Sequence, residues 1–324
     1  MEPLEEAVPE RLAQAEIDSA VSVARRVTEN IQRAVQVRAE VLEHVTVTML
    51  SEGHILVEDY PGVGKTALAR ALSRSIDCQF ARVQCTADLL PADIIGTQIY
   101  NQRESRFEFR PGPIFANVVL VDEVNRASPK TQSGLLECMQ ERHVTVDRHT
   151  HELARPFIVV ATQNPVEYEG TYPLPEAQLD RFMVRVSLGY PSADQESQML
   201  LDHAESDRVL DLEAVADVGD VLAAQAAAGA VHGSDALRRY VVSILDATRA
   251  DPRVDLGASP RAGLMLFRAA KALAALDGRD HALPDDVQQM AGAVLTHRLL
   301  LSPGTGSDER ATVVRDALER VPAL

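Results

Sequence analysis

Residues Gly62-Val-Gly-Lys-Thr66 place small residues, a cation and a hydroxyl at the start of a predicted helix, directly after a predicted strand. Small residues let backbone N–H groups surround phosphate oxygens at the positive end of a helix. Lys65 would reach the β- and γ-phosphates of a nucleotide, and Thr66 would supply a hydroxyl to Mg²⁺. A turn that only requires glycine would explain Gly62 and Gly64, but not the lysine and the threonine behind them.

Position 59 departs from the full phosphate-loop pattern, because the pattern has glycine where this chain has Asp59. The strand and the helix on either side still match the context in which such loops bind nucleotides. The pattern therefore predicts ATP and Mg²⁺ as cofactors. The residues predicted to contact ATP in this loop are Pro61, Gly62, Val63, Gly64, Lys65, Thr66 and Ala67.

Two carboxylates, Asp122 and Glu123, end the apolar run that begins at Val118. Such an arrangement is costly unless the carboxylates face a metal ion or water. Asp122 suits the outer coordination sphere of Mg²⁺ and is counted with Thr66 as a metal-site residue. Glu123 is placed to polarise a water for in-line attack on the γ-phosphate. The alternative is a strand that leaves the core through charged residues.

Asn164 ends another apolar run, Phe157–Asn164. Neighbouring parallel strands deliver their last side chains to one carboxyl edge, which is the usual ligand edge of such sheets. We therefore expect Asn164 to lie close to Asp122 and Glu123. It could instead only cap a turn before Pro165.

The elements that must position these residues follow from hydrophobic periodicity. Apolar residues from 18 to 50 recur at three- and four-residue steps, which predicts amphipathic helix in two pieces. Helix-length segments then alternate with five short β-rich runs, which predicts a parallel sheet with helices on both faces. The five runs are His54–Glu58, Phe80–Cys85, Val118–Asp122, Phe157–Thr162 and Phe182–Leu188.

Two inserts in this alternation, at residues 99–109 and 142–156, have the pattern of β-hairpins. The second insert carries His149-Thr-His151, which we interpret as a solvated tip rather than a metal site, because no third ligand is evident. Strand signals stop after Tyr190, and successive helices are predicted from there to the end. The predicted divisions are a loose leader at 1–16, a nucleotide-binding core at 17–191 and a helical domain at 192–324.

Composition excludes some classes of function. The chain has 324 residues, with 32 Lys and Arg against 48 Asp and Glu, for a formal charge of −16. Affinity for nucleic acid, and for the anionic surface of a membrane, comes largely from basic residues, so both partners are disfavoured. The three cysteines form no metal or disulfide pattern and are interpreted as buried thiols in a reducing compartment. Because the first residues lack a secretory pattern and no apolar run approaches the ~20 residues of a spanning helix, we predict a cytoplasmic protein.

From about residue 30 onward the sequence resembles the MoxR-type AAA+ ATPases. The resemblance rests on nine segments, most of which surround the residues discussed above. These segments are Glu58–Thr66, Asp122–Ala127, Lys130–Ser133, Leu136–Glu141, Ala161–Pro165, Pro173–Phe182, Gly257–Ala262, Leu276–Arg279 and His297–Leu299.

The resemblance implies a five-stranded AAA+ P-loop NTPase core, with a helical lid and two hairpin inserts of the kind shared with magnesium chelatases and replicative helicase relatives. It also implies a ring, often a hexamer, with ATP at the seams. By this resemblance Asn164 is sensor 1, Arg181 is an arginine finger for the neighbouring subunit and Arg261 is sensor 2. An ion pair with Asp180 or Glu176 is the alternative role for Arg181.

The chain departs from the family at residues 35–38, where many members have glycine near the adenine. The resemblance therefore assigns no base contacts around Val37. Members of the family often work with a von Willebrand factor A domain protein on a protein client, and the resemblance implies such a partner here.

Three functions remain to be compared. The first is an ATPase that remodels a protein complex or assists its maturation. The second, a nucleic-acid motor, would require basic hairpins, but Arg and Glu or Asp are mixed on both. The third, a nucleotide-dependent scaffold with little turnover, would usually lack a catalytic residue, whereas the whole predicted set is present. That set is Lys65, Glu123, Asn164, Arg181 and Arg261.

Overall fold

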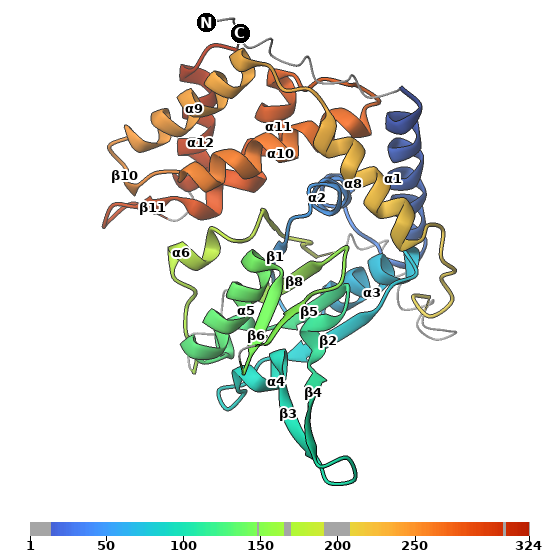
Figure 1. The fold of residues 1–324 in the computed structure, drawn as a ribbon. Coiled ribbons are helices and arrows are strands. Elements are labelled where there is room, and N and C mark those ends of the chain that lie inside the picture. The colour runs from blue at the N-terminus through green and yellow to red at the C-terminus, as the bar shows by residue number, and fades with distance from the viewer. Residues whose placement is uncertain (1–13, 148, 165–169, 191–207, 307–308, 324) are drawn as a thin grey trace, which may run out of the picture.

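The computed structural model describes residues 14–147, 149–164, 170–190, 208–306 and 309–323. The predicted leader at 1–16 lies almost entirely outside these residues, and so does the boundary predicted after residue 191. Figure 1 shows the two parts of the chain, an α/β part that carries a projecting hairpin and a helical part beside it. Among the helices that the structure describes, none is long and apolar enough to cross a membrane.

A five-stranded parallel sheet forms the centre of the α/β part, which confirms the predicted fold class. Its order is β2-β5-β8-β1-β9, so the strand that precedes the phosphate loop is flanked by β8 and β9. The strands are β1 (Ile55–Glu58), β2 (Phe80–Gln84), β5 (Val118–Asp122), β8 (Ile158–Gln163) and β9 (Val184–Val186).

Helices cover both faces of the sheet, and alternate strand residues face opposite ways. Ile55 and Val57 of β1 belong to the core that includes α3 (Lys65–Ser75), whereas Leu56 belongs to the core on the other face. The second core includes residues of α4 (Pro91–Ile95) and α5 (Pro129–Glu141). Burial on both faces explains the nearly continuous apolar runs of the central strands. The described residues of this part also form three short helices, namely η1 (Pro113–Phe115), η2 (Val124–Arg126) and α6 (Glu176–Leu179).

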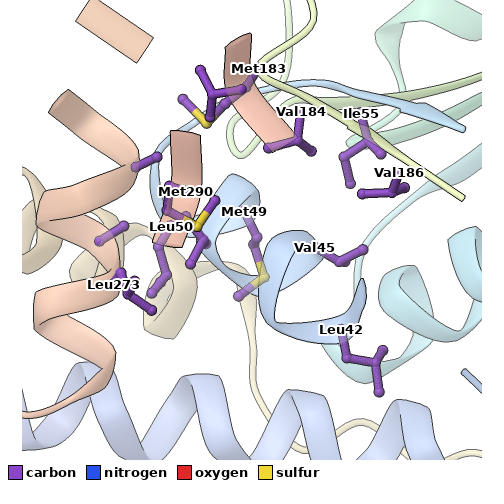
Figure 2. Packing of buried hydrophobic residues seen from close by; sticks show 14 of the residues in the cluster. Leu42, Val45, Met49, Leu50, Ile55, Met183, Val184, Val186, Leu273 and Met290 are labelled. Atoms are coloured by element: carbon purple, nitrogen blue, oxygen red, sulfur yellow. The ribbon is translucent and has the colours of Figure 1, made fainter. Parts of the chain in front are cut away.

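The predicted N-terminal helical segment is α1 (Gln14–Ala34) followed by α2 (Ala39–Leu50). Helix α2 is buried between the sheet and the helical part (Figure 2). Its Val45 lies on the side of the strands, whereas Leu50 lies beside Leu273 and Met290 of the helical part. The two parts therefore share one continuous apolar core.

The helical part begins its described residues at 208 and holds α8 (Val218–Ala230), α9 (Asp235–Arg249), α10 (Pro260–Leu276), α11 (Pro284–Leu295), η3 (Thr296–Arg298) and α12 (Glu309–Arg320). Ser234 and Ser259 begin α9 and α10 as N-caps, each accepting a backbone N–H of the first turn. One short antiparallel pair, β10 (Val254–Leu256) with β11 (Leu300–Leu301), interrupts the helices. Strands this short leave no periodicity that a sequence pattern can detect.

Both predicted hairpins are present, as β3 (Gly96–Asn101) with β4 (Arg106–Pro111) and as β6 (His143–Val146) with β7 (His149–Glu152). The prediction that His149 and His151 form a solvated tip was wrong for His151. Val146 pairs directly with His149, so both histidines belong to the second strand. The half-buried His151 ring stacks on Phe109 of the first hairpin, with ring centroids 4.1 Å apart.

The prediction of buried thiols is confirmed for Cys85 and Cys138, whereas Cys78 is only partly buried. Burial raises the pKa of Cys78 to about 11 and the pKa of both Cys85 and Cys138 to about 12. The carboxylates of Asp122 and Glu123 act in the same direction on Cys85. Thiols with such pKa values remain protonated near neutral pH and are therefore poor nucleophiles.

His54 ties the start of β1 to β8 and to α5, and it makes the fold sensitive to acid. Its Nδ1 accepts the Val159 backbone N–H at 3.0 Å, and its Nε2 donates to the Met139 carbonyl at 3.1 Å. Burial, reinforced by the charge of Arg142, lowers the pKa of His54 to about 4. The neutral ring is therefore the form that the fold requires.

We expect the free energy of unfolding to fall as the pH drops from about 6.5 towards 4. In this range the His54 imidazole binds a proton in the unfolded chain but stays neutral in the folded chain. The loss due to His54 should be about 2 to 3 kcal/mol at the acid end. Urea denaturation between pH 7 and pH 4.5 would measure it, with His54→Asn as the comparison. Equal pH slopes for the two proteins would contradict this role of His54.

Candidate nucleotide-binding and hydrolysis site

The carboxyl edge of the sheet gathers residues from all five strands. The phosphate loop follows β1, Asp122 and Glu123 end β5, and Asn164 follows β8. Gln84 ends β2, and the segment 187–190 follows β9. Because all five strands are parallel, their last residues meet at this edge, which is where such sheets bind ligands.

The phosphate loop has the conformation that its glycines predict. Gly62 has φ +85° and Gly64 has φ +94°, which side chains with a Cβ adopt only under strain. A Cβ added at Gly62 would meet no atom within 4 Å, and one added at Gly64 would meet only Val35, at 4.0 Å. The space beside the loop is therefore open. It lies at the N-terminus of α3, where the first N–H groups have no partner within the helix, so the loop fits a polyphosphate.

The other loop residues lie as the pattern requires. Pro61 and Val63 complete the turn, with Val63 buried, and Lys65, Thr66 and Ala67 begin α3. Lys65 Nζ donates to the Asp59 carbonyl at 2.8 Å, so the ammonium already points back over the loop.

Asp59 itself does not face the open space beside the glycines. One carboxylate oxygen accepts the backbone N–H of Tyr60 at 3.0 Å. The other accepts the Ser187 hydroxyl at 3.1 Å and the Gly189 N–H at 2.8 Å. The departure from glycine at position 59 therefore serves contacts between the loop and the segment that follows β9.

Thr66 offers a hydroxyl and Asp122 a carboxylate, the oxygen groups that Mg²⁺ prefers directly or through bound water, so the residues present fit that ion. One oxygen of Asp122 lies 2.6 Å from an Arg82 nitrogen in an ion pair, and the other accepts the Thr162 hydroxyl at 3.1 Å. The carboxylate is thus fixed in orientation at the end of β5. Mg²⁺, when bound, would neutralise phosphate charge and orient the phosphates.

Glu123 is held in a left-handed backbone conformation, with φ +54°. Such conformations are costly for residues other than glycine and often occur at functional sites. Its backbone N–H donates to Thr162 Oγ1 at 2.9 Å. Its side chain accepts Gln84 Nε2 at 2.9 Å and Arg126 Nη1 at 3.2 Å, so the carboxylate is positioned beside the site while remaining partly exposed to water.

Asn164 is buried where β8 ends, between the strand of the phosphate loop and the strand of Asp122. Its side chain is therefore at the same edge as both, as the sequence predicts. The alternative, a cap on a turn before Pro165, involves residues outside those described.

Arg181 and Arg261 lie together at a different place. Arg181 Nε donates to Gln140 Oε1 at 3.3 Å, and Arg261 Nη2 donates to the same oxygen at 3.1 Å. Burial, and then the charge of Arg261, lowers the pKa of Arg181 from its ordinary value. Two guanidinium groups that share one neutral acceptor would both be stabilised by an anion.

This pair is remote from the phosphate loop of its own chain for two reasons. Arg181 precedes β9, so it lies at the amino edge of the sheet, and the phosphate loop lies at the carboxyl edge beyond β1. The four residues of β1 alone span about 13 Å. In addition, Gln140 belongs to α5, which covers the face opposite α3 (Figure 1).

The alternative that Arg181 pairs with Asp180 does not hold, because Asp180 has other partners. Its two oxygens accept Arg298 Nε at 2.9 Å and the Ser259 hydroxyl at 2.9 Å. No ion pair joins Arg181 to Glu176 among the described residues. Asp180 therefore ties the core to the helical part and leaves its neighbour Arg181 directed at α5.

Several residues of the site have no counterpart in the sequence predictions, namely Arg82, Gln84, Thr162 and Gln140. The sequence could have indicated the first two. Arg82 and Gln84 are polar residues two positions apart, in a strand whose faces are both expected to be covered by helices. They lie on one side of β2, next to Asp122 and Glu123. Gln140 lies in the segment Leu136–Glu141 of the family resemblance, but no local pattern marked it as a site residue, because the two arginines that contact it come from other segments.

Comparisons with known proteins agree with this geometry. Residues 54–184 match the ATPase family associated with various cellular activities (AAA), and residues 246–319 match the AAA lid domain. Protein YeaC of Bacillus subtilis, which is uncharacterised, is 46% identical over 91% of this chain and 93% of its own. Chaperone MoxR1 of Mycobacterium tuberculosis is 40% identical over 89% of this chain and 78% of its own.

Two further relatives cover most of the chain. Protein MoxR of Paracoccus denitrificans is 34% identical over 82% of this chain and 85% of its own. A crystal structure from Cytophaga hutchinsonii, described as that of a suspected ATPase, superimposes with a TM-score of 0.86 at 35% identity. That likeness covers 96% of this chain and 98% of the other.

Proposed function

Because the chain belongs to the MoxR family of AAA+ ATPases, we propose that it hydrolyses ATP with Mg²⁺ as a ring oligomer, expected to be a hexamer. The ring would use hydrolysis to remodel a protein complex or to assist its maturation. A relative named as a chaperone supports this direction. A von Willebrand factor A domain protein is the expected partner, in line with the family resemblance.

The observation that carries the proposal is the position of Arg181 and Arg261. Both contact Gln140, at the opposite edge and on the opposite face from the phosphate loop of the same chain. This position favours a role for the two arginines outside their own subunit. In a closed ring, a surface of one subunit faces a different surface of the next, so the pair could complete the site of a neighbour.

The roles of the remaining residues follow from their places at the carboxyl edge. The loop amides and Lys65 would hold the phosphates, and Thr66 and Asp122 would hold Mg²⁺. Glu123 would orient the attacking water, with Asn164 beside it at the end of β8. Arg181 and Arg261 of a neighbouring subunit would stabilise the charge that develops on the γ-phosphate.

We propose the domain division predicted from the sequence, with a leader at 1–16, a core at 17–191 and a lid at 192–324. The position of the sheet before residue 191 and of the described helices after residue 207 supports it. Helix α2 packs on both parts, so a movement of the lid would change the packing of α2 on the core.

The hairpin of β3 and β4 is the proposed contact with a protein client. It projects from the body of the molecule (Figure 1), and Tyr100 and Phe107 on it are 50% and 69% exposed. Arg106 lies 2.6 Å from Glu104 and 2.9 Å from Glu108, so its charge is balanced within the hairpin. A surface with exposed aromatic side chains and paired charges suits a polypeptide better than the phosphate backbone of a nucleic acid.

The test compares two variants as bait in native cell extract supplied with Mg-ATP. Glu123→Gln should remain loaded with ATP and assembled, whereas Lys65→Ala should bind no nucleotide. Mass photometry would establish the ring size of each bait before the capture. Enrichment of a von Willebrand factor A protein or an enzyme complex only with Glu123→Gln would support the proposal, and enrichment of nuclease-sensitive nucleoprotein would replace it with the nucleic-acid motor.

A further inference from the structure

Asp59 is the residue through which three parts of the site meet. Its backbone N–H donates to the Gln163 carbonyl of β8 at 3.1 Å, directly before Asn164. Its carbonyl accepts Lys65 Nζ at 2.8 Å. Its carboxylate, in a residue only 4% exposed, accepts the Ser187 hydroxyl and the Gly189 N–H.

The segment 187–190 is where the chain leaves the sheet towards the helical part. Arg38, between α1 and α2, also holds it, through a hydrogen bond from Nη2 to the Ser187 carbonyl at 2.7 Å. The ring of Tyr190 stacks on that of Tyr60 in the phosphate loop, with centroids 5.7 Å apart. The phosphate loop and the exit of the chain from the sheet are thus joined by a buried carboxylate and an aromatic pair.

We propose that Asp59 is a positioning residue that couples occupancy of the phosphate loop to the segment 187–190. The inference rests on the proposed function, because it assumes that the loop binds ATP. Phosphate oxygens offer the Lys65 ammonium a charge-assisted partner that is stronger than the neutral Asp59 carbonyl. When Lys65 turns to the phosphates, the restraint on Asp59 changes, and its carboxylate transmits that change to Ser187 and Gly189.

Glycine at position 59 would satisfy the general phosphate-loop pattern but would remove the carboxylate. Asp59→Gly is therefore expected to bind ATP and to lose the coupling, which separates binding from transmission. Asp59→Asn keeps one acceptor oxygen but turns an amide towards N–H or O–H donors, so its coupling should be intermediate. The coupling should therefore weaken from aspartate to asparagine to glycine, an order that is not expected from a residue that only shapes the loop.

The absence of tryptophan from the sequence makes the segment easy to observe. Tyr190 is 68% exposed, so Tyr190→Trp should be tolerated and would place a single tryptophan against Tyr60. With Asp59 present, Mg-ATP and Mg-ADP should shift the tryptophan emission. In the Asp59→Gly background the shift should fall at least about fivefold, while the Kd for nucleotide, from calorimetry, changes by less than about threefold.

Glu58→Gln is the matched control. Glu58 precedes Asp59 and pairs at 2.8 Å with Arg185 of β9, but no hydrogen bond or ion pair of the described residues joins its side chain to the segment 187–190. Its loss should leave the emission shift unchanged. Should Asp59→Gly fail to fold, Ser187→Ala removes one of the donors to the same carboxylate from an exposed position and should weaken the shift in the same direction.

The possible results are distinct. The coupling would be overturned if Asp59→Gly and Asp59→Asn both bound nucleotide with a full-sized emission shift. It would also be overturned if the Tyr190→Trp protein that keeps Asp59 bound nucleotide without any emission shift. Failure of the Asp59 protein to bind nucleotide at all would instead remove the proposed function on which the inference rests. Faster hydrogen exchange of the Gly189 amide in Asp59→Gly, without loss of the nucleotide-dependent shift, would also contradict it, because the contact would then be structural only.

Discussion

Glu123→Gln is expected to bind ATP nearly as well as the wild type and to lower turnover by about 10²- to 10⁴-fold, the range typical of a lost general base. Glutamine keeps the size of the side chain and can still contact Gln84, but it cannot accept a proton from water. The backbone at position 123 has φ +54° and its N–H donates to Thr162, and we expect the substitution to change neither. Steady-state release of phosphate, measured beside equilibrium binding of ATP, would separate the two effects.

Lys65→Ala serves as the opposite control, because it removes the cation of the phosphate loop rather than the base. Its nucleotide affinity should fall to the limit of detection, so its turnover is lost for a different reason. Wild-type hydrolysis by Glu123→Gln would remove the assignment of the catalytic base. Hydrolysis that persists in both variants would place the activity outside the site described here.

Arg181→Ala should lose about 10³- to 10⁵-fold in turnover, the range for an arginine finger, with little change in nucleotide binding. Arg181 and the phosphate loop lie at opposite edges of the sheet, so we expect a different subunit to be able to restore the lost activity. A ring mixed from Arg181→Ala and Glu123→Gln subunits contains seams at which an intact Glu123 meets an intact Arg181. At random equal mixing these are about one seam in four, and activity should exceed the sum of the two separate proteins.

The control for this experiment replaces the Glu123→Gln subunit with one that carries both Glu123→Gln and Arg181→Ala. No seam in that mixture has an intact pair, so activity should stay at the background. If verified rings of the first mixture are no more active than the second, Arg181 does not act between subunits. Arg261→Ala in place of Arg181→Ala tests whether the second arginine, which shares Gln140 with the first, acts in the same direction.

Patterns that extend over a few residues were sufficient for much of the fold. The glycines of the phosphate loop need a left-handed backbone, the apolar runs need burial on both faces, and the strand-turn-strand patterns at 99–109 and 142–156 need only their own residues. Each depends on neighbours in the chain. For the same reason the carboxyl edge, with Asp122, Glu123 and Asn164 on it, could be predicted from the ends of their strands.

The order of the strands and the contacts across them could not be predicted in this way. Only the arrangement β2-β5-β8-β1-β9 brings Arg82 to Asp122 and the segment after β9 to Asp59. His151 was placed on a tip because its stacking partner, Phe109, belongs to a different hairpin.

The sequence by itself indicated the chemistry of the phosphate loop and of the carboxylates, because side-chain type and local spacing specify which groups are present, whereas the roles expected of the two arginines came from the family resemblance. Only the tertiary structure decided that Arg181 and Arg261 share Gln140 away from their own phosphate loop, and that Asp59 binds the exit of the chain from the sheet. The contacts of Arg261 with Gln140 and of Asp59 with Gly189 join residues more than a hundred positions apart, and Arg181 lies 41 positions from Gln140. These contacts form when distant segments are packed into one core, and the burial that drives this packing is non-directional, so local sequence carries no record of which segments will meet.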